Sequence, residues 1–289
     1  MTKNEIDDRE AIWSSAYNGD WEATWINAFY NDWEPVKRHL EREPSLIAVS
    51  YKPTINNERF DFGYTLLGIA GLRKASAEIL EYLVARGANV NAGNNGDGTP
   101  LHFAAMRNPN VEIAKYLISQ GAKVNAKNSC DWTPLHYAAW YNPNVEVLKY
   151  LVSQGAEVNA KDKLDMTPLY FAASHNPNLE ILEYLVSQGA NINAKTKYDA
   201  TPLHAAALHN CDIEVVKYLV FQGSHVNAED YEGWTPLHFA ANHNRNVEVM
   251  KYLVSQGANA NAKTVHGQTP LHLARWREGQ AYLRSVAQN

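Results

Sequence analysis

The feature that most constrains this chain is an internal repeat of fixed length. Thr-Pro-Leu-His, or once Thr-Pro-Leu-Tyr, recurs every 34 residues, with its threonine at Thr99, Thr133, Thr167, Thr201, Thr235 and Thr269. A glycine and a Val/Ile/Ala-Asn-Ala tripeptide keep the same register, and a degenerate copy of the motif begins at Thr65. A period of about 20 to 50 residues is typical of solenoids, in which each unit buries its apolar face against its neighbours.

Each repeat predicts two short helices. Thr99 is a good N-cap, and Pro100 suits the first helical position because its missing N–H would be unpaired there in any case. The Asn-Pro-Asn at 108–110 ends this helix, since proline disfavours helical backbone at the preceding residue. A second helix with an apolar stripe is predicted from Val111 to about Gln120, and Gly121 ends it. A hairpin-like connection over 124–132 leads to the next threonine.

Taken together, Thr-Pro-Leu-His-x-Ala-Ala, the glycine after the second helix and Val-Asn-Ala resemble the ankyrin-repeat family, from about Thr65 to Asn289. The resemblance implies an all-α ankyrin-repeat solenoid with a helix-turn-helix and a hairpin loop in each repeat, closed by helical caps. The family period is about 33 residues. We assign the extra residue here to the inter-helix turn and expect that turn to tolerate it as a surface loop.

The repeat register predicts the domain organisation. Residues 1–64 are expected to form an N-terminal helical cap with a degenerate repeat and a long loop at 45–64. Six repeats follow at 65–98, 99–132, 133–166, 167–200, 201–234 and 235–268, and residues 269–289 form a C-terminal capping repeat. Helices are predicted in the first cap at Glu10–Tyr17, Trp21–Tyr30 and Trp33–Arg42. Its four tryptophans either fill the core of the cap or form a second partner surface.

Composition and motifs argue against several classes of function. A net charge of −5 disfavours nucleic-acid binding, which depends on clustered lysine and arginine. No apolar run approaches the roughly 18 residues that a membrane span needs. The two cysteines show no disulfide or zinc spacing, which favours the cytoplasm, either of the source cell or of a host that receives a secreted effector. No phosphate loop or hydrolase motif occurs, so we expect no enzyme activity, cofactor or metal.

Two histidine series and the repeated asparagines each have a structural interpretation. The resemblance implies that the motif histidines, His102, His136, His204, His238 and His272, bridge neighbouring backbones. His175, His209 and His243 follow the first helix of three successive repeats and could share a metal ion, but no carboxylate recurs beside them, which favours a polar surface. The Val-Asn-Ala asparagines resemble substrates of an asparaginyl hydroxylase, although satisfying the hairpin backbone accounts for them equally well.

Positions that break the period are free to be selected for a partner. They fall in the hairpin tips and after the first helix, positions that the resemblance places on the concave face. All four tryptophans outside the N-terminal cap occur there, as expected for exposed aromatic hot spots. The predicted partner-binding residues are Trp132, Trp140, Tyr141, Leu164, Met166, His175, Tyr198, Leu208, His209, Tyr231, Trp234, His243, His266 and Trp276.

These residues predict a monomeric protein–protein interaction module that binds a protein or peptide in an aromatic-rich concave groove. Its role would be that of an adaptor, effector or inhibitor. One alternative is an immunity-type inhibitor of a toxin or enzyme. The rival class is a small-ligand or metal-binding receptor, or an enzyme, that uses the same groove.

Overall fold

The computed structural model describes residues 22–48, 50, 51, 54, 55, 58, 59, 64–73, 75–94, 96–209 and 212–287. The chain forms two compact units. Unit 1 is Met1–Ala138 with Tyr150–Ala156, and unit 2 is Ala139–Lys149 with Glu157–Asn289. The boundary falls within α8 (Pro134–Tyr141) and α9 (Val145–Ser153). The predicted cap helix at 10–17 lies outside the described residues, as do Trp13 and Trp21.

Unit 1 begins with cap helices and continues into helix pairs. Its elements are α2 (Glu22–Phe29), α3 (Trp33–Arg42), the short 3₁₀ helix η1 (Pro44–Ala48), β1 (Ser50–Tyr51), β2 (Thr54–Ile55), β3 (Glu58–Arg59), β4 (Tyr64–Thr65), α4 (Leu66–Leu72), α5 (Ala77–Ala85), α6 (Pro100–Arg107) and α7 (Val111–Ser119). The long connection at 45–64 therefore contains two antiparallel strand pairs, β1 with β4 and β2 with β3. Trp33 is buried, and its indole N–H donates to Asn31 Oδ1, so this cap tryptophan is a packing residue.

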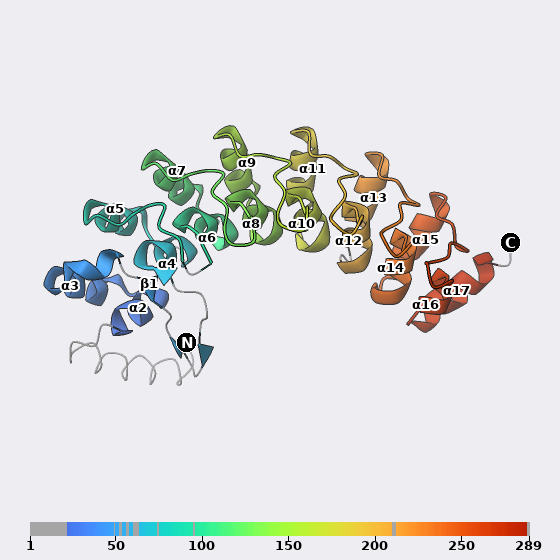
Figure 1. Cartoon of the computed structure of the whole chain (residues 1–289), viewed down its shortest axis with the longest axis horizontal. Helices are drawn as coiled ribbons and strands as arrows, with labels where there is room; N and C mark the ends of the chain where they lie inside the picture. The colour runs from blue at the N-terminus through green and yellow to red at the C-terminus, as the bar shows by residue number, and fades with distance from the viewer. Residues whose placement is uncertain are drawn as a thin grey trace. The chain divides into compact units, whose positions relative to one another are not determined.

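Unit 2 is a stack of helix pairs. They are α10 (Pro168–His175) with α11 (Leu179–Ser187), α12 (Pro202–His209) with α13 (Ile213–Phe221), α14 (Pro236–His243) with α15 (Val247–Ser255), and α16 (Pro270–Leu273) with α17 (Arg277–Ala287). The first helices contact one another in sequence, α10 with α12 and α12 with α14, and the second helices form the other layer (Figure 1). The predicted all-α solenoid of helix pairs is confirmed.

Local sequence explains why each helix begins and ends where it does. Thr99 adopts extended backbone and forms a capping box with His102, and Pro100 occupies the first turn. Gly121 has a φ of 88°, the left-handed conformation that ends the second helix of that repeat. The leucine that recurs on the second helix is fully buried in every copy, at Leu117, Leu151, Leu185, Leu219 and Leu253.

The motif histidines link consecutive repeats, as the resemblance implied. His102 Nε2 lies 2.9 Å from the carbonyl oxygen of Trp132, and His204 Nε2 lies 3.0 Å from that of Trp234. The Nδ1 atom of His102 accepts the backbone N–H of Thr99, so Nε2 carries the proton that it donates. Burial lowers the pKa of His102 and of His204 to about 4, which keeps both rings neutral.

The inter-helix turn differs from the expected tolerant surface loop. Asn108 is only 1% exposed, and its side-chain amide donates to the carbonyl oxygen of Gly71, one repeat earlier. Its Oδ1 accepts the backbone N–H of Asn110. Asn176 and Asn244 make the corresponding contacts in unit 2. Pro109 and Asn110 are exposed, as expected for a surface loop, but the first asparagine departs from that expectation because it satisfies a buried carbonyl group of the preceding repeat.

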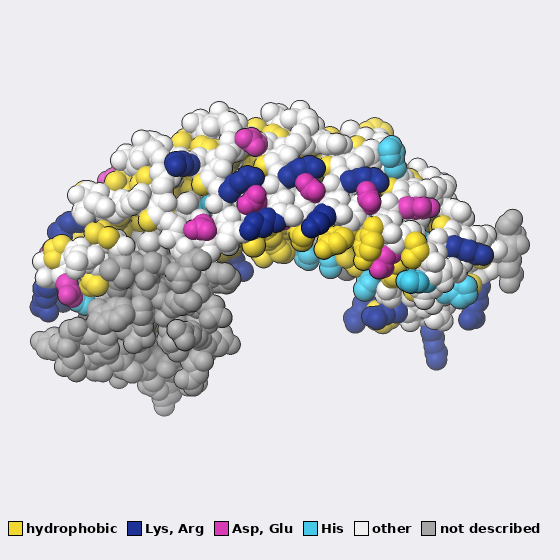
Figure 2. Space-filling view, in the orientation of Figure 1, with side chains coloured by type: hydrophobic (Ala, Val, Ile, Leu, Met, Phe, Trp, Pro, Cys, Tyr) yellow, Lys and Arg dark blue, Asp and Glu magenta, His cyan; other side chains and the backbone are white. Residues whose placement is uncertain are grey.

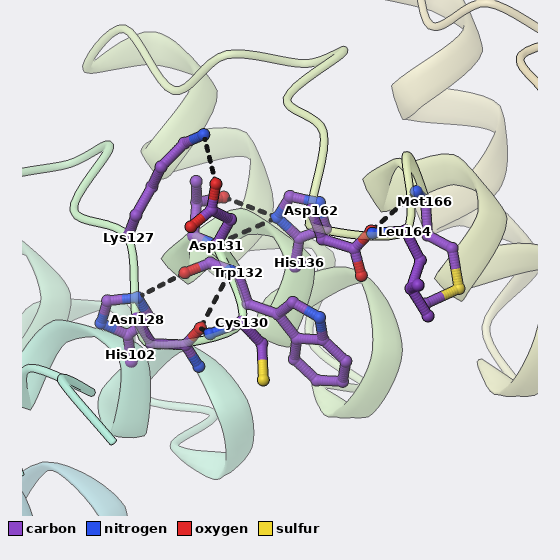
Figure 3. A network of polar contacts seen from close by, with 11 residues as sticks. His102, Lys127, Asn128, Cys130, Asp131, Trp132, His136, Asp162, Leu164 and Met166 are labelled. Carbon is purple, nitrogen blue, oxygen red and sulfur yellow. Dashed lines mark hydrogen bonds and ion pairs between the residues drawn. The ribbon is translucent and has the colours of Figure 1, made fainter. Parts of the chain in front are cut away.

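Asparagine and aspartate side chains organise the hairpins. The Val-Asn-Ala residue Asn159 donates to the carbonyl oxygen of Gly189 and accepts the N–H of Asn191, so the structural role predicted for this series is confirmed. Closer to the tip, Asn128 Oδ1 accepts the N–H groups of Cys130 and Trp132 (Figure 3). Backbone hydrogen bonds then join successive tips, from Lys197 to Leu164, Tyr231 to Tyr198 and Val265 to Glu232.

Candidate functional site

Most of the predicted site residues in unit 2 belong to two surface strips. The helix-end strip lies at the C-terminal ends of α8, α10, α12 and α14 and consists of Trp140, Tyr141, His175, Leu208, His209 and His243. The tip strip lies on the hairpins that precede α10, α12, α14 and α16 and consists of Leu164, Tyr198, Tyr231 and Val265. Because α10, α12 and α14 have eight residues each, about 12 Å of helix separates the two strips. Figure 2 shows hydrophobic and histidine side chains gathered along the lower edge of unit 2.

Rings in the helix-end strip form a stack that crosses three repeats. The Trp140 ring lies 4.5 Å from that of Tyr141 and 5.0 Å from that of Phe171, with interplanar angles of 16° and 25°. The Trp140 ring also lies 5.6 Å from the imidazole of His175. His175 in turn stacks on His209 with ring centroids 4.6 Å apart. Tyr141, at one end of the stack, is 38% exposed.

The imidazoles of this strip are less basic than ordinary histidines. Partial burial lowers the pKa of His175, and burial together with repulsion from His175 and His243 lowers the pKa of His209. Burial, and secondarily the positive charge of Arg275, lowers the pKa of His243. At neutral pH the strip is therefore an uncharged surface with imidazole donors and acceptors among aromatic rings.

The side chains of the tip strip are more exposed than Tyr141 of the helix-end strip or equally exposed. Tyr198 is 49% exposed, Tyr231 60% and Val265 67%, and the two tyrosine rings lie 5.4 Å apart. The carboxylate of Asp162 accepts the N–H groups of Leu164 and Met166 and fixes the tip that carries Leu164 (Figure 3). His266 is exposed on the last tip, beside Val265.

Three of the four tryptophans predicted to be exposed are half-buried packing residues. Trp132 packs edge-on against Tyr137 with ring centroids 5.2 Å apart, and Trp234 packs against Phe239 at 5.1 Å. Trp140 lies inside the ring stack. Only Trp276 is exposed, at 36%. The expectation was wrong for Trp132 and Trp234 because each lies against the aromatic residue in the first turn of the next helix, and for Trp140 because its ring stacks on Phe171.

Phe171, Arg245 and Arg275 were missed as site residues. Phe171 occupies a regular helix position, so its sequence gave no sign that it packs beneath Trp140. Arg245 carried a detectable signal, because it replaces the proline of Asn-Pro-Asn. Arg275 likewise replaces a recurring alanine.

The described residues contain neither a group of three or more potential metal ligands nor a helix long and apolar enough to cross a membrane. A cavity of about 160 Å³ is lined by residues such as Thr65, Leu67 and Ala88 of unit 1. An open depression of about 320 Å³ in the same unit is lined by Asp97, Lys123 and others. Neither contains a predicted site residue.

Stacked helix pairs that recur every 34 residues, with varied residues along the helix ends and tips, define a repeat-protein scaffold. The profile of ankyrin repeats, in three copies, matches residues 43–128, 67–162, 135–230 and 203–285. The chain belongs to the ankyrin-repeat family, whose members are in general non-enzymatic protein-interaction scaffolds. It is similar to the crystal structure of the human ASB11 ankyrin repeat domain, with 28% identity and a TM-score of 0.67 over 77% of this chain and 97% of that one. No curated protein matches the chain.

Proposed function

We propose that this protein is an interaction module that holds a protein or peptide segment against the helix-end strip and the tip strip. The supporting observation is the ring stack from Tyr141 to His209, built from residues that the repeat does not require at those positions. Rigid aromatic side chains give a large contact area for little loss of side-chain entropy. The two strips supply such side chains at the two ends of the first helices.

The two strips would make different kinds of contact with a partner. The tip strip offers exposed tyrosine and valine surface, suited to apolar side chains. The helix-end strip offers neutral imidazoles, each of which can donate or accept a hydrogen bond and so bind backbone amides. A segment that crosses α10, α12 and α14 would meet both.

Affinity purification from the source cell tests this proposal. We expect the Tyr141→Ala/His209→Ala variant to lose most of a partner that the wild-type chain retains. The matched control is Phe221→Ala, which removes an 85% exposed aromatic side chain at the end of α13, away from both strips. Loss of the partner from the control, or its retention by the double variant, would exclude the two strips as the binding surface.

The narrower parts of the proposal concern setting and role. We propose a monomer in the cytoplasm of the source cell or of a host, consistent with the exposed free thiol of Cys130. Adaptor, effector and inhibitor roles, including an immunity-type inhibitor, all use the same surface. The division into a cap at 1–64, six repeats over 65–268 and a cap at 269–289 is part of the proposal. Light scattering on the purified chain tests the monomer.

A further inference from the structure

Three arginines lie where the helix-end strip reaches the C-terminal repeat. Arg245 is in the turn between α14 and α15, Arg275 lies between α16 and α17, and Arg277 begins α17. All three are exposed, and none of them forms an ion pair with another described residue. The lysines of the second helices behave differently, since Lys115, Lys149, Lys217 and Lys251 each pair with a glutamate.

Specific contacts hold these arginines beside the strip. The guanidinium group of Arg245 lies over the Trp276 ring, 4.8 Å from its centroid. The backbone N–H of Arg275 donates to the carbonyl oxygen of Ala241 in α14, and its charge is close enough to contribute to the lowered pKa of His243. Arg275 therefore adjoins the helix-end strip beside His243, and Arg245 is held on Trp276. The arginine cluster is defined as these two residues and Arg277, the first residue of α17.

The repeat itself does not call for these arginines. Arg245 stands where Pro109, Pro143 and Pro177 occur in other repeats. Arg277 is the first residue of α17, which begins four residues earlier in the repeat register than α15 does at Val247. This local positive charge occurs in a protein whose net charge is −5.

Two acidic residues of the C-terminal repeats, Glu278 and Glu232, interact with residues outside the arginine cluster. Glu278 is close enough to Lys251, on α15, to contribute to the raised pKa of that lysine. Glu232, on a hairpin tip, accepts the hydroxyl hydrogen of Tyr231. The guanidinium groups are consequently available to an external carboxylate, which arginine binds through two parallel hydrogen bonds.

We infer that the partner segment is an acidic, aromatic-containing stretch of protein whose carboxylates bind the arginine cluster while its apolar side chains contact the neutral rings of the strip. This inference rests on the proposed function and adds the chemistry of the partner. It also sets the direction of binding, with the acidic end at the C-terminal repeat.

Peptide pools of defined composition test the inference on the full chain. One pool of 12-residue peptides draws on Asp, Glu, Phe, Trp, Leu and Gly, a second replaces the acids by Asn and Gln, and a third replaces them by Lys and Arg. We expect the immobilised chain to retain the acidic pool about tenfold better than the amide pool, because a carboxylate forms charge-assisted hydrogen bonds with arginine that an amide does not. Raising the ionic strength should reduce this preference.

Two variants of equal net charge provide the comparison. Arg245→Gln/Arg275→Gln/Arg277→Gln should abolish the preference for the acidic pool, whereas Lys115→Gln/Lys149→Gln/Lys217→Gln should keep it. Thermal melting checks that both variants are folded. If the acidic pool is not enriched over the amide pool, or if the arginine variant keeps the enrichment, the inference is overturned.

A single-stranded 12-mer oligonucleotide forms the last arm. If the wild-type chain retains this oligonucleotide but not the acidic pool, and the arginine variant does not retain the oligonucleotide, the inference is overturned and the ligand is a nucleic acid. Failure of the inference is distinguishable from failure of the proposed function. A partner captured from the source cell and lost with Tyr141→Ala/His209→Ala would uphold the function even where the acidic pool shows no enrichment.

Discussion

His175 and His209, one repeat apart, stack with their ring centroids 4.6 Å apart and their planes inclined by 29°. Two imidazolium ions at this separation repel each other, so the first proton bound by the pair disfavours the second. Trp140 and Tyr141 adjoin the His175 side of the stack, and His243 and Arg275 lie toward the other end.

This geometry predicts how the histidines titrate. The pKa of His209 should lie below the ordinary value of about 6.5. His175→Asn should raise this pKa, because the variant removes the positive charge of His175 that repels a proton on His209. A histidine-resolved NMR titration measures both values. A pKa for His209 that is unchanged or lower in the variant would show that the two rings do not interact.

Acid should destabilise the fold through the motif histidines. The folded pKa of His102 and of His204, about 4, lies below the unfolded value of about 6.5, so the unfolded chain binds more protons between these limits. Stability is therefore complete above about pH 6.5 and falls as the pH drops toward 4, by on the order of 3 kcal/mol for each of His102 and His204.

Urea unfolding at pH 7 and pH 4.5 checks this expectation. His204→Tyr places at this position the residue that Tyr170 supplies in its own repeat, and should show a smaller loss of stability between the two pH values. An equal loss in the wild-type chain and in the variant would mean that another group controls acid unfolding.

The half-buried tryptophans should contribute to stability. Trp234→Ala removes the indole that packs on Phe239 and should lower the free energy of unfolding by about 1–3 kcal/mol, less than for a fully buried ring. Phe221→Ala, at an 85% exposed site, should change it by no more than about 0.5 kcal/mol. Chemical denaturation followed by circular dichroism gives both values, and equal effects would contradict the packing of Trp234.

Replacing the buried turn asparagine, Asn176, should cost more stability than replacing the helix N-cap Asn178. Asn176 donates to the carbonyl oxygens of Ala139 and Asn142 and is 2% exposed, so Asn176→Ala leaves buried polar groups unpaired and should cost about 2 kcal/mol or more. Asn178→Ala, which removes the N-cap of α11, should cost about 1 kcal/mol. Thermal melting of the two variants compares them, and the reverse order would show that Asn176 is not essential to the turn.

The repeat made the helices predictable. Thr-Pro at the start, glycine at the end and the apolar stripe act within a few residues of one another, so the boundaries of α6 and α7 follow from local chemistry. The histidine bridges could be inferred only from the family resemblance, since His102 and the Trp132 carbonyl are 30 residues apart.

The features that were missed depend on contacts between repeats. The burial of Asn108 requires a carbonyl group 37 residues earlier, and nothing in Asn-Pro-Asn itself shows that contact. The half-burial of Trp132 depends on an aromatic ring at Tyr137, in the next repeat. The sequence shows that Trp140, Tyr141 and His175 occupy positions that vary between repeats. It does not show that their rings stack.

Site-specific photo-crosslinking tests whether the partner binds the helix-end strip. The photoreactive residue p-benzoylphenylalanine would replace Tyr141 in one protein and Phe221 in another, and both would be irradiated in extract of the source cell. We expect one discrete crosslinked species from position 141, competed away by unlabelled wild-type chain, and none from position 221. Crosslinking from position 221 alone would contradict this expectation, because the partner would then bind the second-helix layer.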